Sequence, residues 1–351
     1  MPPPADDDAR YMARCLELAA QFAGFTSPNP IVGCVIVRDG QVLAEGAHER
    51  AGTAHAEIVA LGKLADARGA TLYVNLEPCN HHGRTPPCAP AIVRAGLARV
   101  VVGATDPIPG HGGGIGVLRA AGIDVTEGVL RAACERANLG FYAMARHGRP
   151  GVTLKAAVSL DGKIARAAGP RLMLTGPEAS ADVHLQRRAH DAILVGVETI
   201  LADDPQLTCR LAGGRDPVRV ILDTHLRTPP TARALPALIC TAVDAPDTIR
   251  CATTADGRLD LADVLAKLAA RGIQSVLVEG GARVHASFLR VQLVDQVLLY
   301  VAPLLAGPGP AWSGDAEAKL ALVEETRLGA DVKLTLDFLC DTERASRSSG
   351  T

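Results

Sequence analysis

The chain has 351 residues, a length that predicts two domains, and its formal net charge of -2 indicates no basic face for nucleic acid. No apolar run approaches the about 18–20 residues that a membrane span needs. The first residues, MPPPADDDAR, are acidic and rich in proline, unlike a signal peptide, and the nine scattered cysteines do not suggest a disulfide framework. We therefore expect a cytoplasmic protein with no nucleic-acid or membrane partner.

Helical and strand patterns alternate along the first half of the chain. Apolar residues recur at helical spacing over residues 10–25, and the prolines of TSPNP end that helix. The expected elements that follow are strands 31–37 and 41–48, helix 54–69, strand 70–77, helix 89–97, strand 99–105 and helix 114–123. This alternation predicts an α/β layer fold with parallel strands.

The second half repeats the alternation after a polar link at residues 146–151. It contains an expected strand from Val152, strands 191–200, 217–224 and 274–281, helices 261–272 and 282–291, and a late strand 295–305. The last residues, 341–351, are polar and are expected to form a disordered tail. The predicted domains are therefore 1–147 and 148–340.

One stretch, LEPCNHHGRTPPC at residues 76–88, combines two thiols with residues that break helices. His55 stands upstream in the tripeptide HAE, so a strand followed by a loop can bring Cys79 and Cys88 beside it. One imidazole and two thiolates leave a fourth position open, which is typical of a catalytic zinc. These three residues could also be unrelated core residues, but the joint pattern is much less common by chance.

Glu57 lies two residues after His55 and is free to move a proton instead of binding the metal. Zinc lowers the pKa of a bound water to about 7, and a carboxylate beside it can pass a proton to a leaving amine. This is the chemistry of zinc nucleobase deaminases, in which the two cysteines are usually close together. Here the loop between the thiols is longer, and its members His81, His82 and Arg84 are candidates for contacting substrate.

Several motifs resemble the bifunctional deaminase/reductases of riboflavin biosynthesis. They are TSPNPIVGCVIV, HAE, LEPCNHHGRTPPC and RVVVGATDP in the first half, and VTLKAAVSLDGKIA, DAILVGVETILADDPQLTCR, VRVILDT and VEGGARVHASFL in the second. The resemblance implies a cytidine-deaminase-like domain followed by a dihydrofolate-reductase-like domain. It also implies hydrolysis of the 2-amino group of a phosphoribosylamino-diaminopyrimidine, then NADPH-dependent reduction of the ribosyl chain of the amino-uracil product to ribityl.

The same resemblance assigns roles to residues in both halves. In the deaminase, Glu57 is catalytic, His55, Cys79 and Cys88 bind Zn²⁺, and Asn29, His48, Arg84 and Asp106 contact substrate. In the reductase, the substrate residues are Lys155, Arg171, Arg187, Leu207, Arg210 and Glu279. The NADPH residues are Ala157, Met173, Thr199, Asp203, Thr224, Gly281, Ala282, Arg283, Val284, His285, Ala286 and Ser287. We also expect a homo-oligomer, a dimer or tetramer, that acts on small phosphorylated pyrimidines.

Three departures from the family pattern stand out. Ile108 occupies a position where the family has Asn, and the following loop, GHGGGIG, is a residue shorter than usual. In GPRLMLTG, Arg171 replaces a Ser and Met173 replaces a Trp. Met can still cover a nicotinamide face, whereas Arg171 could contact phosphate or point to solvent.

The cofactor site of the reductase has a weaker signal from the residues alone. No Gly-x-Gly-x-x-Gly follows a strand, which argues against a Rossmann site. In VLVEGGARVHASF, a buried strand runs through Gly280 and Gly281 into a helix, whose free N–H groups can cradle phosphate. Without the resemblance, the same residues would be interpreted as a simple strand-to-helix turn.

Two alternatives stay open on the sequence. The altered GPRLMLTG segment is compatible with a zinc deaminase whose second half has lost reduction. An RNA-binding or RNA-modifying protein is the other. The near-neutral charge and the scarcity of aromatic residues for base stacking, 3% of the chain, argue against it.

Overall fold

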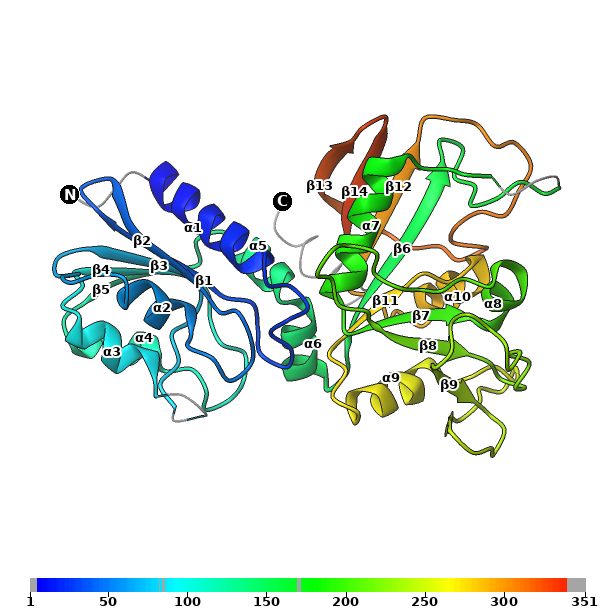
Figure 1. The fold of residues 1–351 in the computed structure, drawn as a ribbon, viewed down its shortest axis with the longest axis horizontal. Coiled ribbons are helices and arrows are strands. Elements are labelled where there is room, and N and C mark those ends of the chain that lie inside the picture. The colour runs from blue at the N-terminus through cyan, green and yellow to red at the C-terminus, as the bar shows by residue number, and fades with distance from the viewer. Residues whose placement is uncertain (1–4, 82, 84–85, 169–171, 340–351) are drawn as a thin grey trace, which may run out of the picture. The chain divides into compact units, whose positions relative to one another are not determined.

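The computed structural model describes residues 5–81, 83, 86–168 and 172–339. The chain divides into two compact units, Met1–His147 and Gly148–Thr351, each with its own sheet and core (Figure 1). Among the helices in these ranges, none has the length and apolar character needed to cross a membrane.

The first unit is built on a five-stranded sheet with the strand order β2-β1-β3-β4-β5. Its elements are α1 (Ala5–Ala20), β1 (Gly33–Arg38), β2 (Gln41–Ala47), α2 (Ala56–Leu61), β3 (Thr71–Leu76), α3 (Cys88–Arg94), β4 (Arg99–Ala104), α4 (Gly114–Ala120), β5 (Asp124–Glu127), α5 (Arg131–Ala137) and α6 (Leu139–His147). β3, β4 and β5 are parallel, but β1 is antiparallel to both its neighbours. Asp39 and Gly40 both have positive φ, the conformation of a tight hairpin turn, so the β1–β2 pair is antiparallel and the sheet is mixed.

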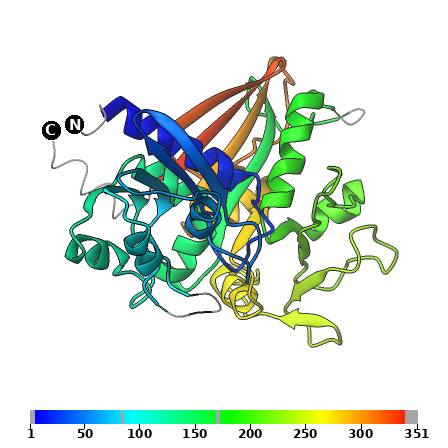
Figure 2. The same cartoon turned by 60° about the vertical axis from the view of Figure 1, so that its left-hand side comes forward.

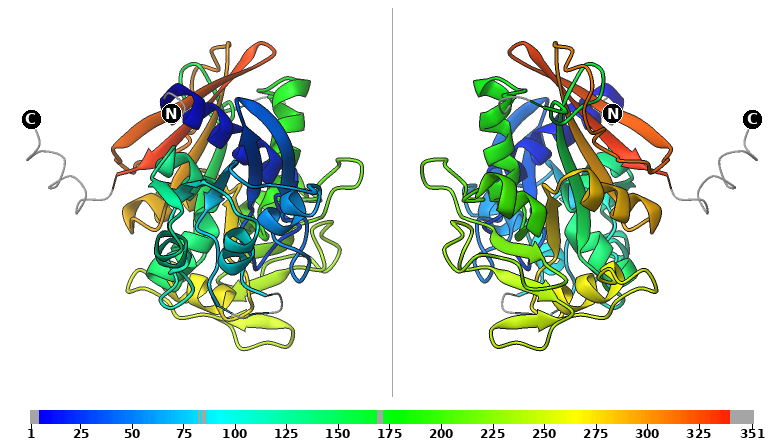
Figure 3. Two further views of the ribbon diagram at one scale, coloured as in Figure 1. Left: turned by 90° about the vertical axis from the view of Figure 1, so that its left-hand side faces the viewer. Right: turned by 90° about the vertical axis from the view of Figure 1, so that its right-hand side faces the viewer.

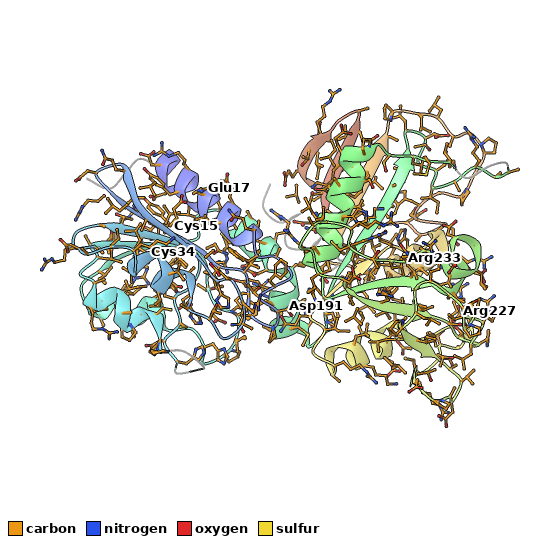
Figure 4. The ribbon with its side chains drawn as sticks, in the orientation of Figure 1. Cys15, Glu17, Cys34, Asp191, Arg227 and Arg233 are labelled. Carbon is orange, nitrogen blue, oxygen red and sulfur yellow. The ribbon has the colours of Figure 1, made fainter. Side chains whose placement is uncertain are left out.

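Helices cover both faces of this sheet. Cys34 and Ile36 of β1 face a core formed with α2, α3 and α4, whereas Val35 and Val37 face the core beneath α1 and α5. Figure 4 labels Cys15 of α1 and Cys34 of β1, both buried. A Cβ at Gly33 would lie 2.0 Å from the Cys15 carbonyl oxygen, so only glycine allows α1 to pack this closely.

The second unit is built on a nine-stranded sheet with the order β10-β9-β8-β7-β11-β6-β12-β14-β13. Its elements are β6 (Gly151–Ser159), α7 (Pro177–Ala189), β7 (Ala192–Gly196), α8 (Val197–Asp203), β8 (Val218–Leu222), β9 (Leu238–Thr241), β10 (Thr248–Arg250), α9 (Leu261–Ala269), β11 (Ser275–Val278), α10 (Ala282–Arg290), β12 (Gln296–Ala302), β13 (Leu320–Leu328) and β14 (Asp331–Phe338). The strands from β10 to β12 are parallel, and the antiparallel hairpin β13–β14 extends the sheet at β12 (Figures 2 and 3).

The helices of this unit also lie on opposite faces of its sheet. α9 and α10 pack on the largest core, which includes Leu154 of β6 and Leu194 of β7. On the other face, α8 packs against Ile193 and Ile221, and α7 packs against Tyr300 of β12. The parallel strands therefore leave their carboxyl ends free for ligands, the usual position in such sheets.

Three predicted elements were wrong in extent. The first helix begins and ends five residues earlier than 10–25. The helix predicted for 54–69 ends at Leu61, and Asp66 then accepts the Arg68 N–H in a local turn that competes with helix. The strand predicted for 191–200 ends at Gly196, where α8 begins, because the apolar run continues into the buried face of that helix. The predicted tail lies outside the residues that the structure describes.

Candidate active sites

His55, Cys79 and Cys88 form a compact cluster in the first unit. His55 is the residue before α2, Cys79 follows β3, and Cys88 is the first residue of α3. The ligand atoms of the three residues lie within 4.8 Å of one another, with His55 Nδ1 3.2 Å from Cys88 Sγ and 3.5 Å from Cys79 Sγ. One nitrogen and two sulfurs fit Zn²⁺ with a further position open.

The surroundings of Cys79 favour its thiolate form. The Cys88 backbone N–H, at the N-terminal end of α3, donates to Cys79 Sγ at 3.4 Å. Hydrogen bonding from the Cys88 thiol, with that from His55, lowers the pKa of Cys79 to about 4 despite partial burial. The thiolate is the form of cysteine that binds metal ions, so Cys79 is suited to act as a metal ligand.

Glu57 lies in the first turn of α2, two residues from His55, and its side chain is only 3% exposed. Burial raises the pKa of this carboxyl group. Glu57 is not part of the ligand cluster. A carboxyl group whose pKa is raised toward neutrality can accept and release a proton beside the cluster.

A cavity of about 280 Å³ opens beside the cluster. Asn29, His55, Cys79 and His81 line it, together with Pro28, Gly52, Thr53 and Gly83. His48 lies behind Asn29, with its Nε2 3.1 Å from the Asn29 amide nitrogen and its Nδ1 3.1 Å from the Ala54 carbonyl oxygen. Burial lowers the pKa of His48, so the neutral ring donates to Ala54 and accepts from Asn29, which fixes the direction of the Asn29 amide.

Glu77 has a role that the sequence did not indicate. Its buried carboxylate accepts N–H groups from Asp106, Gly113 and Ile115, and thereby holds the loop that leads into α4. Asp106 in turn accepts the Ile108 N–H at 2.8 Å. Asp106 is outside the residues that line the cavity. His82 and Arg84 lie outside the described residues.

The second unit contains a nearly buried cluster of charges at the carboxyl end of β11. Val278 pairs with Leu154, so the next residues, Glu279 and Lys155, are neighbours on parallel strands. Arg187 of α7 donates from Nε and Nη2 to the two Glu279 oxygens at 2.8 and 2.9 Å, and Lys155 Nζ lies 3.7 Å from Glu279. Burial opposes ionisation, but Lys155 and Arg187 outweigh it and lower the pKa of Glu279 to about 2.

A larger cavity, of about 770 Å³, lies at the carboxyl ends of β7 and β8 in the same unit. Seven predicted NADPH residues line it: Thr199, Thr224, Gly281, Ala282, Arg283, Val284 and Ser287. It is also lined by His225 and by Arg227 (Figure 4) and Arg258, whose guanidinium groups pair with Glu198 and Asp256 of the same lining. α10 begins at this cavity, and its Gly281 N-cap has no side chain that would compete for the free N–H groups. A cavity of this size with basic residues suits a dinucleotide phosphate.

Comparisons with known proteins match both halves of the chain to known domains. Residues 5–104 match the cytidine and deoxycytidylate deaminase zinc-binding region, and residues 150–334 match the RibD C-terminal domain. The riboflavin biosynthesis protein RibD of Bacillus amyloliquefaciens is 43% identical, over 93% of this chain and 95% of that protein. The Escherichia coli protein of the same name is 41% identical, over 86% and 89% respectively.

The chain belongs to the RibD family. A solved diaminohydroxyphosphoribosylaminopyrimidine deaminase/5-amino-6-(5-phosphoribosylamino)uracil reductase from Thermotoga maritima is 35% identical, with a TM-score of 0.83 over 95% of this chain and 99% of that one. Acinetobacter baumannii RibD is 36% identical, with a TM-score of 0.81 over 96% and 100%. Like its RibD relatives, the protein is a bifunctional deaminase and reductase of riboflavin biosynthesis that uses Zn²⁺ and NADPH. The predicted fold class, activities and cofactors are confirmed.

Several residues predicted from the RibD resemblance lie away from the larger cavity. Ala157, Asp203, His285 and Ala286 do not line it, and the Met173 side chain is 77% exposed. His285 is a buried residue of α10, and its Nδ1 lies 3.1 Å from the Trp312 carbonyl oxygen. Its ring therefore anchors α10 to the segment that contains Trp312. Arg171 lies outside the described residues.

Proposed function

We propose that the cavity beside His55, Cys79 and Cys88 takes the diaminopyrimidine ring of the phosphoribosylamino substrate. The three ligands would hold Zn²⁺, which when bound makes a water acidic enough to react at neutral pH. Glu57 takes a proton from the attacking water and delivers it to the leaving 2-amino group, which departs as ammonia. The buried position and raised pKa of Glu57 support this role.

His48 and Asn29 would orient the pyrimidine ring. The His48 ring directs the Asn29 amide, whose remaining hydrogen-bonding groups lie at the cavity. Arg84 and Asp106 are also proposed to contact the substrate. Ile108 offers a backbone N–H, which Asp106 already accepts, and has no amide side chain for the substrate.

We propose that the reductase substrate lies beside Lys155 and Glu279, with its phosphate near Arg187 and Arg210. The Arg187 guanidinium already donates hydrogen bonds to two partners: Nε and Nη2 to Glu279, and Nη1 to the Thr208 carbonyl oxygen. The Arg210 side chain is exposed and makes no ion pair within residues 172–339, so it is the better candidate for phosphate. Leu207 and Arg171 are proposed to complete this site.

The proposed NADPH site is the cavity at the start of α10, where Gly281, Ala282, Arg283, Val284 and Ser287 would contact phosphate and Thr199 and Thr224 would flank the dinucleotide. Ala157, Met173, Asp203, His285 and Ala286 do not line this cavity, and their role toward NADPH is proposed from the family resemblance alone. When bound, NADPH would supply a hydride to C1′ of the opened ribosyl chain, and Lys155 and Glu279 would balance charge beside that carbon. The carboxylate–ammonium–guanidinium cluster around Glu279 is the observation that carries the proposal for the reductase.

We further propose that the domains extend over 1–147 and 148–340, and that the protein is a cytoplasmic homo-oligomer, a dimer or tetramer. The odd, scattered cysteines support a reducing compartment.

A coupled experiment tests both activities on one preparation. Zinc is measured per chain, ammonia release is followed with the diaminopyrimidine phosphate, and NADPH oxidation is followed with that compound and with its deaminated product. We expect about one zinc per chain and both activities. Ammonia release without NADPH oxidation on the deaminated compound would leave a deaminase with an inactive reductase half and would contradict the proposal.

A further inference from the structure

Residues 207–210 of the reductase unit form a short segment that begins in an unfavourable backbone conformation at Leu207. Leu207 is buried and has a φ of 57°, in the left-handed region that residues with a side chain rarely adopt. Such a conformation persists only where neighbouring groups hold it. The segment ends at Arg210, whose exposed guanidinium is the proposed phosphate ligand.

Helix α7 holds this segment through three hydrogen bonds. Arg187 Nη1 donates to the Thr208 carbonyl oxygen at 3.1 Å. The Cys209 thiol donates to the His184 carbonyl oxygen at 3.4 Å, and the Arg210 backbone N–H donates to His184 Nδ1 at 3.3 Å. His184 therefore takes part in two of the three bonds, and its ring accepts the bond from the Arg210 backbone.

The charge state of His184 follows from this geometry. Nδ1 can accept the Arg210 N–H only without a proton, which leaves the ring proton on Nε2. The charged groups that face the ring are Arg187 on the same helix, Arg210 on the segment and Glu279 after β11. Burial and the two guanidinium groups lower the pKa of His184, and Glu279 and a hydrogen bond with the Thr208 backbone oppose them only partly. The ring is therefore neutral at neutral pH.

We infer that His184 is a positioning residue of the reductase, whose neutral imidazole fixes the Arg210 backbone so that the guanidinium meets the substrate phosphate. The inference rests on the proposed role of Arg210 in phosphate binding. His184 need not touch the substrate, and its contribution is to the affinity for the phosphorylated compound. Removal of the acceptor should weaken substrate binding, with a smaller effect on the hydride step.

Two substitutions at His184 distinguish the effect of its hydrogen-bond acceptor from the effect of its side-chain volume. His184→Gln keeps an oxygen that can accept the Arg210 N–H, whereas His184→Leu keeps a similar volume and has no acceptor. With the deaminated amino-uracil phosphate and NADPH, His184→Leu should raise the substrate KM about three- to ten-fold, the range expected for one hydrogen bond. Its kcat and its KM for NADPH should stay within about two-fold, and His184→Gln should restore the substrate KM.

The folding of each variant is checked on the same samples. The only tryptophan, Trp312, lies in the reductase unit and reports its thermal unfolding. Ammonia release reports the deaminase unit. If His184→Leu lowers kcat and raises both KM values together, or if His184→Gln fails to restore the substrate KM, His184 acts only as a packing residue and the inference is wrong.

The pH dependence of the folded wild type gives a second test that does not need His184→Leu to fold. The ratio of the substrate KM of wild type to that of His184→Gln should rise as the pH falls from neutrality toward the acid limit of the folded enzyme, because only the imidazole can be protonated and its pKa is lowered. Titration of the substrate phosphate cancels in this ratio. A ratio that stays constant through the pH at which the His184 ring takes up its proton, followed by NMR of the imidazole, would show that Nδ1 has no role, and a falling ratio would show that the imidazolium binds phosphate directly, so either result overturns the inference.

Arg210→Ala distinguishes the inference from the proposal on which it rests. Loss of a charged phosphate contact should raise the substrate KM more than about ten-fold. An unchanged KM in Arg210→Ala would refute the phosphate site itself. A large increase in Arg210→Ala together with an unchanged KM in His184→Leu would refute only the positioning role of His184.

Discussion

Glu279→Gln should destabilise the reductase unit, because it leaves Lys155 and Arg187 in a nearly buried cluster without a counter-charge. The pKa of Glu279 is about 2 in the folded protein, against an ordinary value of 4.5. This difference corresponds to about 3 kcal/mol of stability at neutral pH, an order-of-magnitude value. For a unit of this size we expect a fall in Tm of roughly 6–12 °C.

The pH dependence of this loss has a definite sign. Because folding depresses the pKa of Glu279, its stabilising contribution is complete above about pH 4.5 and is lost as the pH falls through about 2. The difference in unfolding free energy between wild type and Glu279→Gln should therefore be largest at neutral pH. It should shrink steadily below pH 4.5, because the carboxylate of the unfolded chain then takes up a proton while the folded carboxylate stays ionised until about pH 2.

Urea unfolding followed by Trp312 fluorescence measures this difference in the reductase unit, because the first unit contains no tryptophan. Glu198→Gln is the matched control: it removes the same charge from an exposed ion pair with Arg227 and should change stability by less than about 0.5 kcal/mol. An equal urea midpoint for wild type and Glu279→Gln at neutral pH would refute the reasoning. A deficit that stays constant down to pH 3 would show that lost packing, and not lost charge, is the cause.

Three further predictions concern the two activities. Cys88→Ser should lower zinc retention strongly, because a hydroxyl is a poor substitute for a thiolate; metal analysis that shows wild-type zinc content would remove Cys88 from the ligand set. Glu57→Gln should keep zinc but lower ammonia release at least about 100-fold, because an amide cannot transfer the proton, and near-normal release would exclude Glu57 from the mechanism. The same Glu57→Gln protein should still oxidise NADPH with the deaminated substrate. Asp203→Ala should release ammonia but form no ribityl product. A folded Glu57→Gln protein that cannot reduce the deaminated substrate would argue against independent sites.

The metal cluster could be predicted from the sequence because its signal is local. His55, Cys79 and Cys88 occur in short motifs, and a strand followed by a proline-rich loop brings them together. The ion cluster of the reductase had no such signal. Lys155, Arg187 and Glu279 come from three distant segments: the register of β6 with β11 brings Lys155 beside Glu279, and the packing of α7 adds Arg187.

Other features depend on backbone groups, which leave little trace in a sequence. Glu77 could not be identified as the organiser of the α4 loop because its partners are the N–H groups of residues far along the chain. His184 was missed because its ring binds the backbone of Arg210. Helix α7 did have a recognisable signal in Pro177 at its first turn, a position that favours proline.

The positions of the strands also bear on the order in which the enzyme matures during its synthesis. All three zinc ligands and every strand of the first sheet occur before residue 148, so this unit can assemble while the ribosome is still translating the second half. The second unit cannot assemble its sheet in the same way. Its first strand, β6, pairs with β11 and β12, which begin only at Ser275 and Gln296. Such distant pairing slows folding. The nascent chain can therefore carry a metal-loaded deaminase before its reductase has a central strand pair.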